Sequence, residues 1–234
     1  VEAARAAGFS NINLDLMYGL PGQSLASWTE TVQSLLALEP THVSCYALTI
    51  EDGTRLSQDI AKNLVPRPDE SIQNDMDSAA EVILKEAGFE RYEISNYAKP
   101  GFSCRHNLLY WTDGDYLGLG PSAQSYVNGI RFGTVHDLTA YTESLNTGHL
   151  PITERISLSD IERQRDALVF GLRRVQGVPR HLVRPDMPEY PALIRLSRHG
   201  LIECTDDYIH LTARGRRFAD SVAEELYSVN IRPD

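Results

Sequence analysis

The sequence predicts an α/β fold followed by a small α+β unit that is winged-helix-like, and two patterns carry this prediction. Residues 9–50 predict a strand, a helix and a strand at the spacing of a parallel βαβ unit. From residue 191 on, a helix, a short hairpin and a further helix follow one another, as in winged-helix units. We therefore expect two domains, which cover residues 1–150 and residues 151–234.

The first elements are a helix end and a strand. Residues 1–7 are typical of the end of a helix that Gly8 stops, so we expect that a preceding part of the protein is missing. Residues 9–17 alternate and then become almost continuously apolar, which predicts a parallel strand covered on both faces. The turn residues of segment 18–22 end this strand.

The next helix is predicted from a capping box at its start, in which Ser27 is followed by Glu30. One helical face then recurs at Trp28, Val32, Leu35 and Leu36. Pro40 stops this helix, and residues 41–50 predict a second buried strand.

A further helix and a third strand are predicted in the middle of the chain. Pro66 and Pro68 mark a surface connection, after which apolar residues recur at helical intervals until Gly88: Ile72, Met76, Ala79 and Ile83. Residues 89–97 predict a third strand, and residues 99–101 predict a turn. The segment after this turn thus follows a strand end, and ligands of parallel α/β folds bind at the carboxyl ends of strands.

The C-terminal unit is predicted to begin with a helix that Ser159 and Glu162 open as a second capping box. Residues 191–199 predict a helix that Gly200 stops. A hairpin around a polar turn follows, and Thr212 caps a final helix.

The basic cluster of this unit consists of Arg214, Arg216 and Arg217. A winged-helix-like unit can bind DNA, and it can equally serve as a packing or protein-interaction element. Acidic residues follow the arginines immediately, which favours a solvated helix face.

Composition argues against several classes of function. The formal net charge of -10 opposes non-specific binding to nucleic acid and to anionic lipid. No apolar run is long enough for a transmembrane segment. Cys45, Cys104 and Cys204 are isolated and odd in number, so we expect a cytoplasmic protein without a disulfide framework.

Residues 103–111 bring a histidine, an amide, a thiol and two large aromatic side chains together. A neutral imidazole can ligate iron, and a flat aromatic ring can lie against a macrocycle. The alternative is that His106 is a hydrogen-bonded structural residue at the edge of a core. Cys104 is a further candidate ligand, although a lone thiol is more often a small buried hydrophobe. The remaining histidines belong to no recognisable constellation and are expected to be structural or exposed: His42, His136, His149, His181, His199 and His210.

Three segments occur in the order found in a known family: residues 13–23, residues 92–101 and residues 106–111, the last being His106-Asn107-Leu108-Leu109-Tyr110-Trp111. Together they resemble the HemW family of haem chaperones, which are relatives of oxygen-independent coproporphyrinogen III oxidase in the radical SAM superfamily. The first segment is shared by both families, whereas the third is typical of the chaperones. The resemblance covers essentially the whole chain.

The resemblance implies the C-terminal part of a partial radical SAM (β/α) barrel, with the ligands of a 4Fe-4S cluster outside this chain. Asp15 matches an acidic residue that contacts the ribose of S-adenosylmethionine, and a carboxylate can accept both ribose hydroxyls. The alternative for Asp15 is a strand-end carboxylate that caps backbone amides.

The resemblance also implies a haem-binding role for the third segment. His106 matches the family residue implicated in haem binding and is expected to be an axial ligand of the haem iron. Tyr110 and Trp111 are expected to lie against the porphyrin faces, and Asn107 to fix the local loop geometry.

The function that the resemblance implies is a haem chaperone that delivers haem to acceptor haemoproteins without catalytic turnover. The alternative is a radical SAM enzyme that oxidatively decarboxylates coproporphyrinogen III. A third class, a nucleic-acid-binding protein, is favoured only by the C-terminal arginines. Because a truncated barrel exposes strand edges, we also expect this chain to form a homodimer or to be marginally stable.

Overall fold

The computed structural model describes residues 1–229, and the chain forms two compact units that divide between Cys104 and Arg105. The boundary expected between residues 150 and 151 falls inside the second unit. β7 (Ile152–Ser157) pairs antiparallel with β6 (Ile130–Thr134) and so joins residues on both sides of that point. The compact units therefore do not follow the expected boundary.

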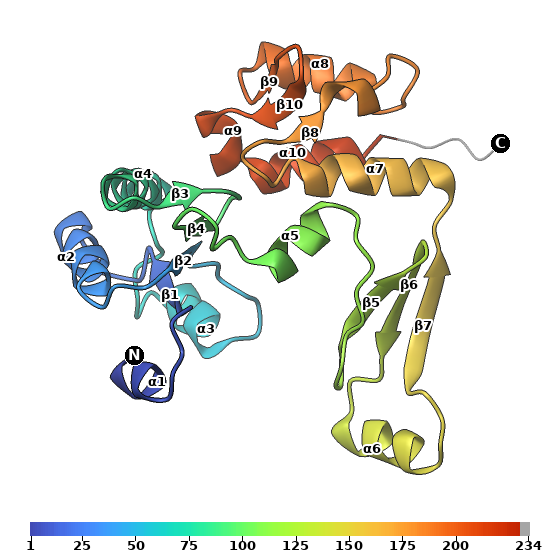
Figure 1. Ribbon diagram of the computed structural model, residues 1–234, viewed down its shortest axis with the longest axis horizontal. Coiled ribbons are helices and arrows are strands. Elements are labelled where there is room, and N and C mark those ends of the chain that lie inside the picture. The colour runs from blue at the N-terminus through green and yellow to red at the C-terminus, as the bar shows by residue number, and fades with distance from the viewer. Residues whose placement is uncertain (230–234) are drawn as a thin grey trace. The chain divides into compact units, whose positions relative to one another are not determined.

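The first unit begins with the predicted helix end and βαβ unit (Figure 1). α1 (Glu2–Ala6) is followed by Gly8 with φ of 95°, a conformation that favours glycine. β1 (Asn13–Tyr18) and β2 (His42–Ala47) pair in parallel, and α2 (Leu25–Leu36) connects them. The parallel βαβ prediction is confirmed.

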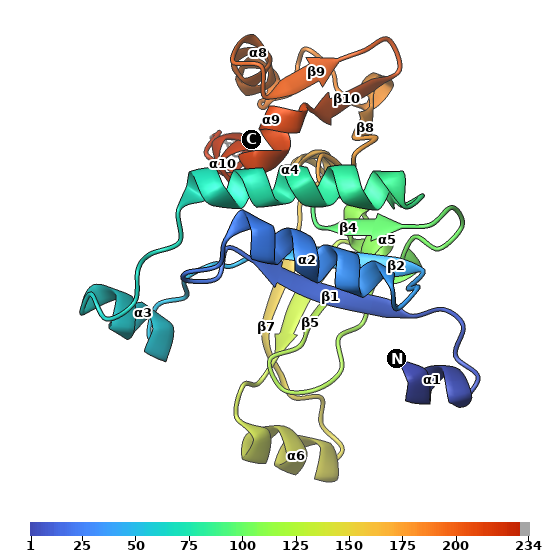
Figure 2. The ribbon, with the colours of Figure 1, turned by 90° about the vertical axis from the view of Figure 1, so that its left-hand side faces the viewer.

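One face of the sheet is covered by helices, whereas the other face carries polar side chains. α2 and α4 (Glu70–Glu86) lie side by side over the sheet (Figure 2). The exposure of β1 alternates along the strand, so Asn13 and Asp15 are exposed. The expectation that this strand is covered on both faces is therefore wrong. The core beneath the two helices consists of Tyr18, Trp28, Val32, Leu35, Val43, Cys45, Met76, Ala80, Leu84, Phe89 and Tyr97.

The predicted third strand is instead a short hairpin. β3 (Glu90–Arg91) and β4 (Asn96–Ala98) pair antiparallel, and the sheet has the order β1-β2-β4-β3. The turn between them forms because the buried Glu93 carboxylate accepts hydrogen bonds from the Ser95 amide and the Asn96 side chain. A continuous strand would not bring these groups together.

The antiparallel direction of β4 changes where the aromatic motif begins. β4 pairs antiparallel with β2, and Ala98 lies beside His42, the first residue of β2. The segment after β4 therefore starts at the amino-terminal ends of the parallel strands. The expectation that it follows their carboxyl ends is wrong, although the turn at residues 99–101 is confirmed.

The two predicted capping boxes have different outcomes. α2 begins one turn earlier than expected, because Ser24 is its N-cap and accepts a hydrogen bond from the Ser27 amide. Ser27 is thus inside the helix, and the box with Glu30 is wrong. In α7 (Asp160–Gly171), the box formed by Ser159 and Glu162 is confirmed with both reciprocal hydrogen bonds.

Several elements were not predicted. In the first unit, α3 (Arg55–Ala61) precedes the loop with Pro66, which is exposed as expected. In the second unit, β5 (Gln124–Val127) pairs with β6, and α6 (Leu138–Asn146) separates β6 from β7. The second unit begins with α5 (Arg105–Trp111), which carries the histidine and aromatic residues.

The C-terminal part has the predicted order of helix, hairpin and helix. α8 (Tyr190–Arg198) is followed by β9 (Ile202–Cys204) and β10 (Tyr208–Leu211), which pair antiparallel. Thr212 caps the next helix as expected, but Phe218 divides that helix in two. Its two halves are α9 (Ala213–Arg217) and α10 (Ala219–Tyr227). Two short elements before α8 were not predicted: β8 (Val178–Pro179), which pairs with β10, and a 3-10 turn, η1 (Arg180–Leu182).

Side-chain contacts fix the positions of the C-terminal helices. The buried Glu189 carboxylate accepts a hydrogen bond from Arg165 Nε at 2.6 Å. A Cβ at residue 215 would lie 1.8 Å from the carbonyl oxygen of Leu201, so this position requires glycine.

Among residues 1–229, no helix combines the length and the apolar character needed to cross a membrane.

Candidate functional site

Asp15 lies on the polar face of the sheet in the first unit. The parallel register pairs Asn13 with His42 and Asp15 with Ser44, so these side chains share one face. Asn13 Nδ2 donates a hydrogen bond to Asp15 Oδ1 at 2.7 Å. The bond found at this carboxylate thus comes from a side chain rather than from the backbone amides of the capping alternative. An exposed, oriented carboxylate has the chemistry to accept the two hydroxyls of a ribose.

His42 is buried on this face with a hydrogen bond on each ring nitrogen. Its Nδ1 lies 2.7 Å from Asn13 Oδ1, and its Nε2 lies 2.8 Å from the hydroxyl of Tyr92. Burial lowers the pKa of His42, with the Asp15 carboxylate acting in the opposite direction. His42 is thus a buried, hydrogen-bonded residue, which agrees with the expectation that it is structural, although its contacts with Asn13 and Tyr92 were not expected.

Sequence reasoning missed Glu93 and His42 for the same reason. Glu93 is 1% exposed and holds the turn between β3 and β4. Glu93 lies in the antiparallel hairpin, and so does Tyr92, which contacts His42 Nε2, whereas the sequence predicts a straight strand there. Residues 89–97 contain several other polar residues, so Glu93 does not stand out and the sequence offers no clear signal.

His106 and Tyr110 face the same side of α5. They are four residues apart, and the Tyr110 hydroxyl lies 3.0 Å from His106 Nε2, with ring centroids 4.9 Å apart. His106 is exposed. Because both groups project from one side of one helix, Tyr110 cannot bind the opposite face of a porphyrin that His106 ligates.

Trp111 faces a different direction from His106. Its ring centroid lies 6.3 Å from that of Phe170 in α7, and the Arg173 guanidinium lies over it at 4.9 Å. Its Nε1 is buried without a hydrogen-bond partner among residues 1–229. This indole N–H can therefore donate a hydrogen bond to an acceptor atom of a bound molecule.

Tyr110 and Trp111 line one hollow of about 140 Å³ in the second unit. A cavity of about 150 Å³ holds one benzene ring, so this hollow has room for one edge of a tetrapyrrole and not for the whole macrocycle. Its wall is mainly aromatic, and its residues are Tyr110, Trp111, Asp113, Gly114, Tyr116, Tyr126, Arg131 and Phe170. Tyr126 and Arg131 were not expected because β5 and β6 were not predicted. Tyr116 and Phe170 lie outside these strands, and no sequence pattern connects them with residues 106–111.

The charged groups at this hollow compensate each other. Arg131 donates to Asp166 Oδ2 at 2.7 Å, and the Tyr227 hydroxyl donates to Asp166 Oδ1 at 2.7 Å. Burial raises the pKa of Asp166, although both donors act to lower it. The Arg131 guanidinium also lies 5.6 Å from the Phe170 ring. The hollow therefore has a mainly aromatic wall, and the charge of its arginine, Arg131, is paired with Asp166.

Asn107 and Cys104 have less defined roles. Asn107 is half-buried inside α5, so it occupies a helix and not the loop that was expected. Cys104 is half-buried, and its amide donates to the Tyr92 hydroxyl at 3.3 Å. By contrast, burial raises the pKa of Cys45 to about 12, which makes that thiol unreactive.

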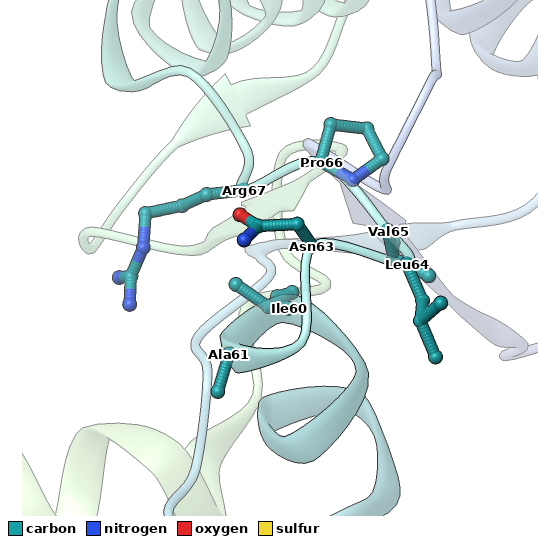
Figure 3. A pocket seen from close by; sticks show the side chains of 7 residues that line it. All are labelled: Ile60, Ala61, Asn63, Leu64, Val65, Pro66 and Arg67. Atoms are coloured by element: carbon teal, nitrogen blue, oxygen red, sulfur yellow. The ribbon is translucent and has the colours of Figure 1, made fainter.

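A larger, open hollow of about 570 Å³ lies at the end of α3 (Figure 3). One continuous segment, residues 60–67, forms its wall, and Figure 3 shows Leu64 and Arg67 pointing to opposite sides of the loop. Polar groups do not converge there, and the predicted site residues do not line it. We therefore assign no binding role to this hollow.

Similarity to characterised proteins identifies the family. No family model matches the chain. The chain is 34% identical over 223 residues to the heme chaperone HemW of Mycobacterium tuberculosis, which covers 95% of this chain and 57% of the relative. It is 40% identical over 184 residues to the heme chaperone HemW of Synechocystis, which covers 76% and 44%. The chain belongs to the HemW family.

A solved structure supports the radical SAM fold of this HemW-family chain. Coproporphyrinogen III oxidase HemN from Escherichia coli, a radical SAM enzyme, matches 97% of this chain and 57% of its own with a TM-score of 0.76. At 20% identity, this likeness shows the fold alone. The predicted fold class is confirmed. The chain spans about 57% of the length of its Mycobacterium tuberculosis relative.

Three groups can be compared with the residues of this HemW-family chain, namely an iron-sulfur cluster, S-adenosylmethionine and haem. Among residues 1–229, no group of three or more His, Cys, Asp or Glu side chains could hold a metal ion, so the described part does not fit an iron-sulfur cluster. The oriented Asp15 carboxylate fits a ribose. The exposed His106 and the aromatic hollow with its unused Trp111 donor fit the iron and one edge of a haem.

Proposed function

We propose that this chain is the haem-binding part of a haem chaperone that transfers haem to acceptor haemoproteins and performs no turnover. The observation that carries the proposal is an exposed imidazole on the same short helix as two residues of an aromatic hollow. The names of the relatives in Mycobacterium tuberculosis and Synechocystis, heme chaperone HemW, support it.

In this proposal, His106 would ligate the haem iron, with an imidazole nitrogen donating the electron pair that the iron accepts. Tyr110 and Trp111 contact the macrocycle from the wall of the hollow, and Asn107 lies beside His106 on α5. Since Trp111 turns away from His106 toward α7, it meets an edge of the macrocycle rather than a face. The 4Fe-4S cluster belongs to the intact protein, and Asp15 contacts the ribose of its S-adenosylmethionine.

The partners in this proposal are haem, acceptor haemoproteins and a second copy of the chain. We also propose a cytoplasmic location, because Cys45, Cys104 and Cys204 are all free.

Nucleic acid is not a partner in this proposal. Arg214 donates to the His199 carbonyl at 3.2 Å, which supports a structural use of the basic cluster, and the net charge is -10.

Haem transfer tests the proposal. The intact protein is loaded with haem and mixed with an apo-haemoprotein, and the absorption spectrum of the acceptor is followed. We expect faster or more complete loading of the acceptor than with the same amount of free haem. Equal loading with and without the protein would contradict a chaperone role.

The second candidate is an oxidase that acts on coproporphyrinogen III, and the fold of the Escherichia coli enzyme favours it. The two functions differ in chemistry, because the oxidase releases two carboxylates as CO₂ whereas the chaperone leaves its cargo unchanged. The intact protein, with its cluster and S-adenosylmethionine, is given coproporphyrinogen III. Formation of protoporphyrinogen would favour the oxidase over the chaperone.

A further inference from the structure

A continuous series of side-chain hydrogen bonds leads from Asp15 into the interior of the first unit. Asn13 Nδ2 donates to Asp15 Oδ1 at 2.7 Å, and Asn13 Oδ1 lies 2.7 Å from His42 Nδ1. His42 Nε2 lies 2.8 Å from the Tyr92 hydroxyl. Tyr92 in turn accepts from the Cys104 amide at 3.3 Å. The series thus joins β1, β2, the turn after β3 and the segment before α5.

The chemistry of its two ends fixes the direction of every bond. A carboxylate only accepts, so the Asn13 amide nitrogen must face Asp15 and the Asn13 oxygen must face His42. Ser44 Oγ also donates to that oxygen, at 3.3 Å. A neutral His42 must therefore carry its proton on Nδ1 and accept at Nε2. The Tyr92 hydroxyl then donates to His42 while it accepts from the Cys104 amide.

The surroundings hold His42 in this neutral tautomer. Its side chain is 5% exposed, and burial disfavours the charged ring. The Tyr92 ring meets the imidazole edge-on, with centroids 5.6 Å apart. Asp15 and Asn13, in contrast, are exposed at the other end of the series. Buried residues with defined hydrogen bonds thus lie behind the exposed Asp15 carboxylate and hold its donor, Asn13, in place.

We propose that Asn13, His42 and Tyr92 are positioning residues that hold the Asp15 carboxylate in the orientation in which it accepts both ribose hydroxyls of S-adenosylmethionine. This inference rests on the proposed ribose contact of Asp15. An exposed carboxylate on a strand can rotate, and fixing one of its oxygens before binding removes an entropic cost. Asn13 makes that contact, while His42 and Tyr92 prevent the Asn13 amide from turning over.

Asn13→Asp is the sharpest variant for this proposal. The new side chain has the same shape and still accepts from His42, but it replaces the donor that faces Asp15 with a second negative oxygen. Asn11→Asp is the matched control, because it adds the same charge two residues earlier. Asn11 Oδ1 accepts from the Thr41 hydroxyl at 2.7 Å, and that role is kept.

Binding of S-adenosylmethionine to the intact protein is measured by calorimetry for the wild type, both Asn variants and Asp15→Asn. We expect Asn13→Asp to bind at least about tenfold more weakly, as for a lost hydrogen bond to a charged group, and Asn11→Asp to bind like the wild type. If Asp15→Asn weakens binding and Asn13→Asp does not, the positioning role is overturned while the ribose contact stands. If Asp15→Asn binds like the wild type, the ribose contact itself fails.

His42 variants separate positioning from a merely structural role. Gln can donate to Asn13 and accept from Tyr92, whereas Phe of similar volume can do neither. We therefore expect His42→Gln to retain most of the affinity that His42→Phe loses. Equal affinities in folded samples, as judged by circular dichroism, would overturn the proposal.

Nuclear magnetic resonance of the ring nitrogens gives a readout that does not depend on binding. With ¹⁵N-labelled histidine, His42 should show a protonated Nδ1 and an unprotonated Nε2 at neutral pH, and the signal is assigned by its loss in His42→Gln. A protonated Nε2 would reverse the direction of the series and overturn the proposal. Haem binding by Asn13→Asp, measured in parallel, reports separately on the proposed function, and we expect it to be unchanged.

Discussion

At the scale of single residues, haem binding depends on what the His106 side chain can reach. Its imidazole is exposed, and the Tyr110 hydroxyl 3.0 Å from Nε2 is its hydrogen-bond partner. A ring nitrogen that binds iron cannot keep that hydrogen bond. Haem binding through Nε2 therefore competes with Tyr110, and this competition can be measured.

Tyr110→Phe should strengthen haem binding by roughly twofold to tenfold, the range that corresponds to the loss of one competing hydrogen bond. The ring that lines the hollow remains, so contact with the macrocycle is kept. Spectrophotometric titration of haem into both proteins measures the effect. Weaker binding by Tyr110→Phe would indicate that the hydroxyl supports the ligand instead of competing with it.

His42 predicts a loss of stability on acidification. Its folded-state pKa lies below the ordinary value of 6.5 because burial disfavours the charged ring. The unfolded chain therefore binds a proton that the folded protein does not, and the free energy of unfolding falls as the pH drops below about 6.5. Urea unfolding at about pH 7 and about pH 5.5 measures this fall. It should be smaller in His42→Gln, and an equal fall in both proteins would contradict the assignment.

Residues whose role depends on a local motif could be predicted, and residues whose role depends on strand pairing could not. Asp15 and His106 belong to segments that are recognisable in the sequence alone. Glu93 and the Tyr92 partner of His42 reach their positions only because β4 turns antiparallel to β2. That turn depends on a buried carboxylate, and no local pattern reveals it.

At the scale of elements, helices were predicted better than strands. The helical period of α4 is visible over many residues and its existence is confirmed. The residues of its buried face differ, however, because the sequence predicts Ile72, Met76, Ala79 and Ile83, whereas the structure buries Met76, Ala80 and Leu84. β3 spans two residues and β4 spans three, too few for alternation to be detected. The start of α2 was misplaced by one turn because Ser24 and Ser27 are equally good candidate caps in the sequence.

The revised start of α2 can be tested with two matched variants. Ser24→Ala should lower the free energy of unfolding by about 1 kcal/mol, because it removes the cap that accepts from the Ser27 amide. Ser27→Ala should be nearly neutral, since residue 27 lies inside the helix, where alanine is favoured. Chemical denaturation of both variants measures the difference. The opposite order of effects would restore Ser27 as the cap.

At the scale of the whole molecule, the exposed edge of β1 predicts self-association of this chain. In the described sheet, β1 is the end strand of the order β1-β2-β4-β3. Its outer edge leaves backbone groups available for pairing with another chain. Met17 adds an apolar side chain that is 48% exposed. Size-exclusion chromatography with light scattering should show a dimer whose fraction increases with concentration, and a monomer at all concentrations would contradict the prediction.

A haem titration tests whether the His106 imidazole binds the haem iron. Haem is added to the wild type, to His106→Ala and to His149→Ala, whose histidine is also exposed in the second unit. The wild type and the His149 variant should show the same shifted Soret band and affinity. His106→Ala should lose that band and bind at least about tenfold more weakly. An unchanged spectrum and affinity in His106→Ala would rule out His106 as a ligand of the haem iron.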